Sequence, residues 1–457
     1  MLIPNNVGLA PGTPLHRALT AYQAKFRLWW KDRGPAEFLE RPMPLRCPTG
    51  QTRGAGWAAT AVLRPDDYAW GLFTVPCADQ KIAFGDAAGQ PAWNCVPDEC
   101  RRILLEHIRV QADVENGSIE QARTLTGSVP CPGDLHNLFQ FLLEEGRHSL
   151  AMVHLLLEHF GSEGKAQAEA LFERLSGDAE RPRLLDAFNV RTEDWLSHFM
   201  WCFLADRVGK YQIQAVTQSA FAPLAASARF MMLEEPLHIT FGLMGLERIL
   251  VRSIEVTRRR DRLDVFEDGA IPLPVFQKYF NFWISKTHDL FGNDESSRSQ
   301  ELYGLGIRAP RGTTGGAPPA EDVAIDRRVG DHVETHRVAF PRAVNAVMRR
   351  QYDAEVERIV ERWNEAIRHA GLPALLSVPH ERFAREHGPC RGLPFDVDGT
   401  LLPQSEAPRL AARMPSVQDR AAVAALMGRE LGDGRVAGWI APPGVRLADM
   451  ALSPGWA

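Results

Sequence analysis

Glu144-Glu-Gly-Arg-His148 and Glu234-Glu-Pro-Leu-His238 are two copies of one pattern, Glu-Glu-x-x-His, within a chain of 457 residues. They contain the only two of its fourteen histidines that have an acidic residue three positions before them. Residues three apart in a helix lie on adjacent turns of one face, so the carboxylate and the imidazole of one copy can reach the same metal ion. A single Glu-x-x-His arises by chance in a chain of this length, so the surrounding sequence must decide whether the pair binds metal.

Each copy has a further acidic residue about one helix length before it. Glu115 lies 30 residues before Glu145, and Asp206 lies 29 residues before Glu235. Two residues of an antiparallel helical hairpin lie side by side only when the turn falls near the midpoint between them. The positions of helix-breaking residues therefore test whether these acids can meet.

Both midpoints fall in breaks between helical patterns. The first is Pro130, inside the run Gly127-Ser-Val-Pro-Cys-Pro-Gly-Asp134, and the second lies between Ser219 and Pro223. Glycine and proline clusters of this kind end helices. The sequence therefore predicts that two helical hairpins bring six side chains to one level of a bundle: Glu115, Glu145, His148, Asp206, Glu235 and His238.

The helices around these acids are strongly apolar, as in Leu138-Phe-Gln-Phe-Leu-Leu143 and Phe199-Met-Trp-Cys-Phe-Leu-Ala205. Unpaired carboxylates buried there would be costly. Four carboxylates and two imidazoles instead make a nearly neutral site around two Fe²⁺, a ligand set that suits iron or manganese better than thiolate-preferring metals. The residues therefore favour a di-iron centre over a buried network of ion pairs.

Two assignments stay open on the residues alone. Glu144 and Glu234 each lie four residues before a histidine of the motif, so they could bind metal or accept a hydrogen bond from an imidazole N–H. The hydrogen-bonding role is favoured. Glu120 competes with Glu115 for the first hairpin, because its midpoint with Glu145 fits the turn only slightly less well.

Apolar periodicity predicts a mainly α fold. Helical patterns cover about residues 98–125, 136–160, 192–218 and 224–255, with Thr192 as a candidate N-cap of the third helix. A polar crossover at residues 161–191, with a short helical piece near 166–175, separates the two hairpins. Hairpin, crossover, hairpin is the connectivity of a ferritin-like four-helix bundle. Pro236 lies inside the fourth helix and is expected to loosen it locally, as in the bulges found at such sites.

The regions on either side of the bundle are expected to pack on it within one structural domain. Residues 1–97, rich in proline, glycine and tryptophan, are expected to form a loop-rich wrap with strand-like pieces such as Tyr68-Ala-Trp-Gly-Leu-Phe73. Residues 98–256 contain the bundle. Residues 257–457 are expected to add helices at about 272–291, 342–370 and 416–430, a polar loop at 292–334 and a loop-rich tail.

Bulk composition excludes several classes of protein. The net charge of -5 gives no general attraction to nucleic acid or anionic lipid, and no stretch approaches the ~18 uninterrupted apolar residues of a membrane span. The seven cysteines form no CxxC pair and the first residues lack an export-signal pattern, so a reduced, cytoplasmic protein is expected. The basic run Arg258-Arg-Arg-Asp-Arg262 is interpreted as a solvated helix end, with a phosphate-binding or partner-docking patch as the alternative.

Other chemistries have weaker support in the sequence. The chain has no glycine-rich phosphate loop, no GxSxG elbow and no dinucleotide fingerprint, so electrons for redox chemistry at the metal must come from elsewhere. A radical-generating ribonucleotide reductase subunit needs a tyrosine near the first Glu-x-x-His, but Met152 stands four residues after it and none of the six tyrosines lies in the first two helices. For an iron-storage ferritin relative, the chain is far too elaborate.

Several strings outside the metal motif resemble the oxygenase component (component B) of the benzoyl-CoA 2,3-epoxidase family, nearly over the full length. They are Ile82-Ala-Phe-Gly-Asp-Ala-Ala-Gly-Gln-Pro-Ala-Trp93, Asp113-Val-Glu115, Asn137-Leu-Phe-Gln140, Asp206-Arg207 and Trp439-Ile-Ala-Pro-Pro443. The family's ligand pattern falls on the six residues found by spacing, which favours Glu115 over Glu120.

The resemblance implies a ferritin-like di-iron monooxygenase that uses O₂ to epoxidise the ring of benzoyl-CoA or a close aryl-CoA. It also implies two iron ions as cofactors, and electrons from NADPH delivered by a separate flavin and iron–sulfur reductase. No nucleic acid or membrane partner is expected.

One departure from the family concerns the second motif. The family usually carries an additional histidine beside the histidine ligand, where this chain has Pro236-Leu237. The aryl substituents accepted, benzoyl or a substituted ring such as aminobenzoyl, therefore stay open, as does a degradative or biosynthetic pathway. The oligomeric state, the bridging carboxylates and an N-oxygenase or hydroxylase acting on another aryl substrate also stay open.

Overall fold

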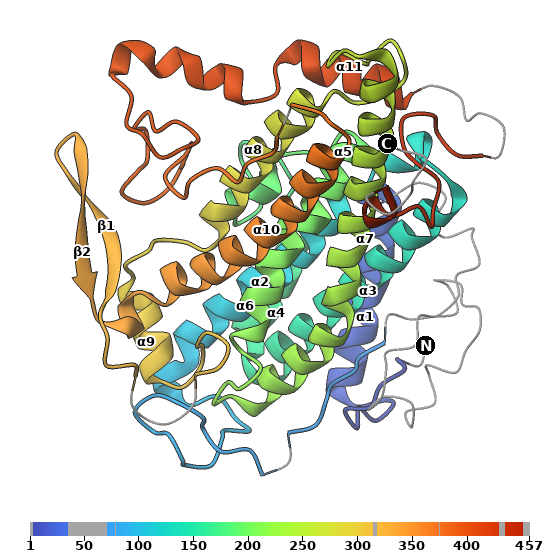
Figure 1. Ribbon diagram of the computed structural model, residues 1–457. Coiled ribbons are helices and arrows are strands. Elements are labelled where there is room, and N and C mark those ends of the chain that lie inside the picture. The colour runs from blue at the N-terminus through green and yellow to red at the C-terminus, as the bar shows by residue number, and fades with distance from the viewer. Residues whose placement is uncertain are drawn as a thin grey trace.

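The first hairpin expected from the sequence is present in the computed structural model, which describes residues 3–34, 71–77, 79–313, 318–373, 375–428 and 435–450. Helix α2 (Arg101–Gln121) packs along α3 (Pro132–His159), and α4 (Gly161–Glu173) contacts both from the crossover (Figure 1). Pro132 begins α3 at a position where the missing N–H costs no hydrogen bond. Nearly all of α3 from Leu138 to Leu156 is buried, which places its motif in the core.

The second hairpin consists of a broken helix and a long continuous one. Its first arm is α5 (Trp195–Met200), a π-helical segment (Trp201–Ala205) and α6 (Asp206–Gln214), and its second arm is α7 (Ala222–Arg260). Helix α7 packs against α3, α6 and the π-helical segment. The two hairpins therefore meet along α3 and α7, the helices that carry the repeated motif.

The predicted N-cap of the third helix is wrong. Asp194 caps α5, because its carboxylate accepts a hydrogen bond from Ser197 N at 2.7 Å. Thr192 instead donates its hydroxyl proton to Gln121 O at 2.6 Å and so fastens the end of the crossover to α2.

No bulge interrupts the helix at Pro236. Helix α7 continues as an α-helix through Pro236, and Thr240 donates its hydroxyl proton to Pro236 O at 2.6 Å. The wide turn lies in the facing helix, directly before Asp206. There Gly242 of α7 approaches so closely that a Cβ would lie 2.4 Å from Phe203 N. The bulge and its glycine thus belong to the contact between the two arms of the second hairpin.

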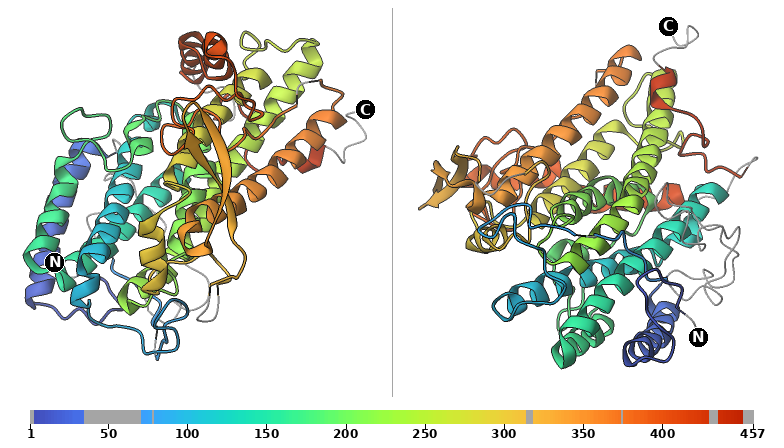
Figure 2. Two further views of the ribbon diagram at one scale, coloured as in Figure 1. Left: turned by 90° about the vertical axis from the view of Figure 1, so that its left-hand side faces the viewer. Right: turned by 90° about the horizontal axis from the view of Figure 1, so that it is seen from below.

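The N-terminal region contains a helix that the sequence interpretation missed. Helix α1 (Pro14–Arg33) begins with Thr13, which accepts a hydrogen bond from His16 N, and buries an aromatic face that includes Tyr22 and Trp30. It packs on α3 and lies beside α4 on one flank of the molecule (Figure 2). Residues Pro14–Arg33 therefore depart from the loop-rich wrap expected for residues 1–97. Of the strand-like piece at residues 68–73, only residues 71–73 are described.

The C-terminal region covers the opposite flank of the bundle. Helix α8 (Leu273–Leu290) packs on α5, the π-helical segment and α7, while α10 (Val344–His369) packs on α6 (Figure 1). The remaining α-helices are α9 (Ser297–Gly304), α11 (Val417–Met427) and α12 (Leu447–Met450). Short 3₁₀ helices cover Asp98–Cys100, Leu125–Ser128, Asp186–Asn189, Phe340–Arg342 and Gln404–Arg413.

A β-hairpin occupies part of the stretch expected to be a loop. Strands β1 (Val323–Val329) and β2 (His332–Val338) pair antiparallel, with Val329 opposite His332. The two-residue turn places Gly330 at φ +62°, which glycine tolerates at the first central position of a tight hairpin turn. The mainly α expectation is nevertheless confirmed, since this hairpin is the only two-stranded sheet among the described residues. No helix within the described ranges is long and apolar enough to cross a bilayer.

Candidate metal centre

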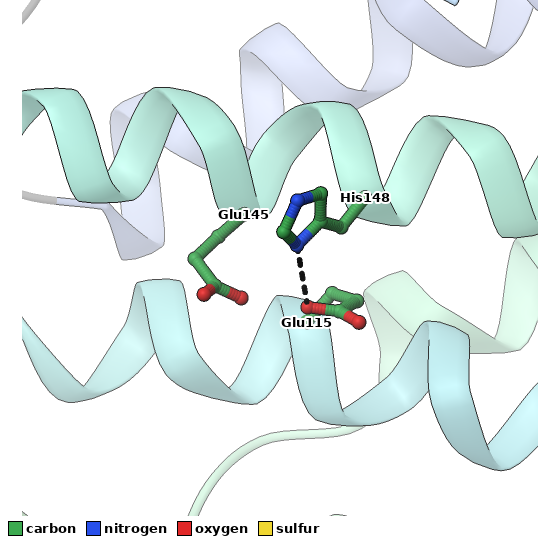
Figure 3. Close-up of side chains that lie close together, drawn as sticks. All are labelled: Glu115, Glu145 and His148. Atoms are coloured by element: carbon green, nitrogen blue, oxygen red, sulfur yellow. Dashed lines mark ion pairs between the residues drawn. The ribbon is translucent and has the colours of Figure 1, made fainter. Parts of the chain in front are cut away.

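Two overlapping groups of buried Glu and His side chains lie between the hairpins. In the first, the ligand atoms of Glu115, Glu145 and His148 lie within 4.8 Å of one another, and in the second the same holds for Glu145, Glu235 and His238. Figure 3 shows the first group, with Glu145 and His148 pointing down from α3 and Glu115 up from α2. Glu145 belongs to both groups, so the two lie side by side at one level.

Each histidine of the motif turns Nδ1 toward carboxylates of this cluster. His148 Nδ1 lies 3.7 Å from Glu115 Oε2 and 3.6 Å from Glu235 Oε1, and His238 Nδ1 lies 3.2 Å from Glu145 Oε1. Within the described residues His148 Nδ1 has no hydrogen-bond partner. The glutamate of each motif therefore lies beside the histidine of the other motif, and both histidines present one nitrogen to the space between the carboxylates.

The other nitrogen of each histidine meets a glutamate of the opposite hairpin. His148 Nε2 lies 3.1 Å from Glu234 Oε2, and His238 Nε2 lies 2.9 Å from Glu144 Oε2. A carboxylate that accepts the Nε2 proton fixes the imidazole tautomer and leaves Nδ1 free to bind metal. Glu144 and Glu234 thus occupy the positions of hydrogen-bond acceptors for the imidazoles.

Arg147 joins these two glutamates. Its Nη2 forms an ion pair with Glu234 and lies 3.6 Å from Glu144 Oε1, while the side chain itself is 2% exposed. One guanidinium therefore connects the carboxylates that orient both histidines. Because the second motif has Leu237 at the equivalent position, the arrangement is asymmetric.

Asp206 lies at the same cavity as this cluster, whereas Glu120 does not. Asp206 is buried and lines the same cavity as Glu115, Glu145 and Glu235, but it belongs to neither three-residue group. Its Oδ2 atom makes no hydrogen bond to a described residue. Glu120 lies elsewhere, because its carboxylate accepts hydrogen bonds from Ser176 N and Arg183 Nε, both at 3.0 Å. The geometry thus separates the two candidates of the first hairpin.

Crowding of negative charge perturbs the acids of the cluster. Burial, together with the charges of Glu115, Glu235 and Asp206, raises the pKa of Glu145 well above its ordinary value. Burial also raises the pKa of Glu235 to about 8. Against burial, hydrogen bonds with Glu115 and Glu234 raise the pKa of His148 to about 10. Against burial, hydrogen bonds with His148 and Glu145 lower the pKa of Glu115. Carboxylates crowded in this way are stabilised when a cation lies between them.

A cavity of about 540 Å³ opens over the four carboxylates. Apolar side chains, such as Val114, Phe188 and Ile213, form much of its wall. Three arginines also line it: Arg109, Arg298 and Arg308. The arginines at the end of α7 do not line this cavity, and Arg260 and Arg262 form ion pairs with Asp268. Their interpretation as a phosphate site for a ligand of this cavity is therefore not supported.

Comparison with known proteins identifies the family. No family profile matches the chain. A protein of Aromatoleum evansii named "Benzoyl-CoA oxygenase component B" is 38% identical over an alignment of 457 positions, which covers 96% of this chain and 95% of the relative. The chain belongs to the benzoyl-CoA oxygenase component B family. The resemblance expected from the sequence is confirmed.

Three residues of the candidate site in this chain were not assigned a role from the sequence. Gln111 Nε2 donates to Glu115 Oε1 at 2.5 Å, and its position one turn before Glu115 could have indicated this contact. Arg147 stands inside the quoted motif, yet its partner Glu234 lies on another helix. Arg308 carries no local sequence signal, because its partners Gln212 and Asn345 lie in two distant segments.

Proposed function

We propose that this chain is the oxygenase component of a di-iron monooxygenase that epoxidises the ring of benzoyl-CoA or a close aryl-CoA. The observation that carries this proposal is the pair of overlapping Glu and His groups at the floor of a largely apolar cavity. The name of the relative supports the substrate class and the use of O₂. The two hairpins, the crossover and the contact of α3 with α7 support a ferritin-like bundle in residues 98–256.

The donor set fits a pair of divalent iron ions. Glu115, Glu145, Asp206 and Glu235 supply four carboxylates, and His148 and His238 supply two imidazoles already turned inward. Two Fe²⁺ would balance the charge of four carboxylates, which explains why such a costly group of acids is buried together. Glu145 and Glu235 lie close to the histidines of both motifs and would hold the ions together with them.

The iron pair, when bound, would supply the reduction of O₂ that adds one oxygen atom to the ring and releases the other as water. The chain's own residues orient the histidines, exclude water and form an apolar surface for the ring. Glu144 and Glu234 accept the Nε2 protons of the histidines and keep both Nδ1 atoms available. Val114, Phe188 and Ile213 exclude water from the space above the carboxylates and offer an apolar surface to a planar ring.

The electrons are proposed to come from NADPH through a separate flavin and iron–sulfur reductase. The word "component" in the relative's name supports a partner protein for that family. A cytoplasmic location stays a prediction from the sequence.

The test is incubation of the iron-loaded protein with benzoyl-CoA, the reductase, NADPH and ¹⁸O₂, followed by mass spectrometry of the CoA ester. We expect one ¹⁸O atom in the product and none when NADPH or the reductase is left out. The matched control is Glu145→Gln, which removes the carboxylate common to both groups and should abolish incorporation. A protein that is loaded with iron yet consumes no O₂ with any aryl-CoA would contradict the proposal.

The same assay separates the alternative substrates. A panel of benzoyl-CoA, aminobenzoyl-CoA and the free aryl acids would show whether the ring, an amino group or another position receives the oxygen. Oxygen on nitrogen or a phenolic product would indicate an N-oxygenase or a hydroxylase in place of an epoxidase. Iron uptake without O₂-dependent turnover would indicate an iron-binding relative.

A further inference from the structure

Arg308 is a buried cation on the wall of the cavity. Its residue is 6% exposed, and it lies in the segment that follows α9. Nη1 donates to Asn345 Oδ1 at 2.9 Å, and Nη2 donates to Gln212 Oε1 at 2.6 Å. Both partners are neutral amides. Arg308 forms no ion pair with any carboxylate in the described part of the chain.

Arg109 also lines the cavity and forms no ion pair among the described residues, but it is only half-buried. Two further buried or cavity-lining arginines pair with carboxylates. Arg349 is buried but pairs with Asp294 and Glu381. Arg298, on the same cavity, pairs with Glu106 at 2.6 Å. A buried guanidinium held only by neutral acceptors is costly, and a structure keeps one where a ligand completes its hydrogen bonding. Arg308 is therefore the cavity arginine whose neutral contacts leave room for an acceptor from a ligand.

The pKa values of Arg308 and His107 reflect burial and positive charge on this side of the cavity. Burial lowers the pKa of Arg308 to about 10, and it lowers the pKa of His107 to about 3, helped by the charges of Arg308 and Arg298. His107 lines the same cavity and is neutral at ordinary pH. The cavity thus has an acidic floor formed by the candidate ligands and a positively charged wall at Arg308.

We propose that Arg308, held by Gln212 and Asn345, binds the acyl carbonyl oxygen of the aryl thioester. This inference rests on the proposed function and names a contact within its substrate site. A guanidinium has five N–H donors, so two contacts to amides leave further donors for a carbonyl oxygen. A single cavity of about 540 Å³ contains both the four carboxylates and Arg308. Gln212, which accepts from Arg308, lies six residues after Asp206 in α6, about 9 Å along the helix. A ring above the carboxylates therefore brings its own carbonyl toward Arg308 before the phosphates of CoA.

This contact would set the orientation of the ring. The carbonyl is conjugated with the ring and lies in its plane, so a hydrogen bond at a fixed point of the wall limits how the ring can rotate above the carboxylates. It would also give specificity for acyl groups. A thioether with a CH₂ in place of the carbonyl offers no acceptor and would leave the buried guanidinium unsatisfied.

The test compares the dissociation constants of benzoyl-CoA, S-benzyl-CoA and free CoA on the iron-loaded protein, kept oxidised so that no turnover occurs. We expect the wild type to prefer benzoyl-CoA over S-benzyl-CoA by about 10- to 100-fold, the range for a hydrogen bond to a charged group. Arg308→Met should reduce this preference to about threefold or less. Arg308→Lys keeps the charge without the planar fork and should keep part of the preference.

The matched control is Arg298→Met, which alters an arginine of the same cavity whose charge Glu106 already balances. It should change the affinities for both ligands by the same factor. Circular dichroism and thermal melting check that each variant is folded. A preference that survives in Arg308→Met would overturn the carbonyl contact, as would equal weakening of all three ligands, which would place the contact at the phosphates. A wild type that binds no benzoyl-CoA would instead overturn the proposed function itself.

Discussion

Arg147 links the two halves of the candidate metal centre through one side chain. It contacts Glu234, which accepts from His148, and Glu144, which accepts from His238. Arg147→Leu would leave two buried carboxylates close together without this cation, so both would turn away or take up protons. We expect iron affinity to fall by about 10- to 100-fold, the range for loss of groups that orient metal ligands. Competition with a chelator on the reconstituted protein measures this change.

Arg248 provides the control for that substitution. Arg248 is also buried, and it joins α7 to α3 through Asp134 Oδ1 at 2.7 Å. Asp134 lies near the N-terminal end of α3, away from the motif. Arg248→Leu should lower thermal stability and leave iron affinity within about threefold of the wild type. Equal losses of iron affinity in both variants would mean that Arg147 acts only through the packing of the two helices.

The positions of the six acidic and histidine residues could be predicted from the sequence, but the contacts of Arg147 could not. All six residues predicted from spacing face one cavity or one cluster, because hairpin geometry fixes which positions lie level. Arg147 was visible in the quoted motif, but its role depends on Glu234 across the interface between the hairpins. Contacts between side chains of different helices depend on rotamers and packing, which spacing does not contain.

His198 is expected to make the free energy of unfolding depend on pH. Burial among aromatic rings lowers its pKa to about 3, whereas an unfolded chain has a histidine pKa of about 6.5. Between these two values the unfolded chain binds a proton that the folded protein does not, so the free energy of unfolding falls as pH falls. This contributes up to about 1.4 kcal/mol per pH unit. His198→Phe should flatten that slope between about pH 6 and pH 4 in urea unfolding.

The comparison residue is His369, which lies exposed at the end of α10. His369→Gln should keep the wild-type slope, since an exposed ring meets water in both states. An unchanged slope in His198→Phe would show that His198 does not stay neutral in the folded protein.

At the scale of elements, the π-helical segment depends on close contact with a glycine. A Cβ on Gly242 would lie 2.4 Å from Phe203 N and 2.7 Å from Phe199 O, and both are backbone atoms that cannot move alone. Gly242→Ala should therefore push α7 away from the segment before Asp206 and lower the free energy of unfolding by about 1–3 kcal/mol. Denaturant unfolding measures the loss.

Gly209→Ala is the matched control, because a Cβ there would lie 3.8 Å from Glu235 Oε2, an ordinary contact. Alanine in α6 should then be neutral or stabilising by about 0.5–1 kcal/mol. If both variants were equally stable, the close approach at Gly242 would not be what fixes the π-helical segment.

Strong periodicity explains which elements could be predicted. Helices α2, α3 and α7 differ by a few residues at most ends from the ranges expected, because apolar faces and helix breakers mark both ends. Helix α1 was missed although Leu19, Tyr22 and Phe26 repeat at helical spacing. The proline, glycine and tryptophan content around it, together with the polar residues on its buried face, obscured a 20-residue helix. The wide turn could not be predicted, because a contact between helices produces it.

At the scale of the whole molecule, the cavity is assembled from segments far apart in the chain. Its wall takes Val114 from α2, Gly209 from α6, Arg298 from α9 and Asn345 from α10. The sequence predicted the acidic floor, which lies within the two hairpins, but not the wall. The added helices of the C-terminal region therefore close one side of the space above the carboxylates.

Substitution of Gly209 tests whether the ring binds in this space. It lies one turn after Asp206 on the cavity wall, and a side chain there would point past Glu235 Oε2 into the cavity. Gly209→Leu should fill part of the space and weaken benzoyl-CoA binding by about tenfold or more, at about 1.4 kcal/mol per factor of ten. Gly209→Ala, with the same helix backbone but a shorter side chain, should cause a smaller loss. Iron content should stay unchanged in both, because no ligand is removed. Iron-loaded Gly209→Leu protein that binds benzoyl-CoA as tightly as the wild type would place the ring elsewhere.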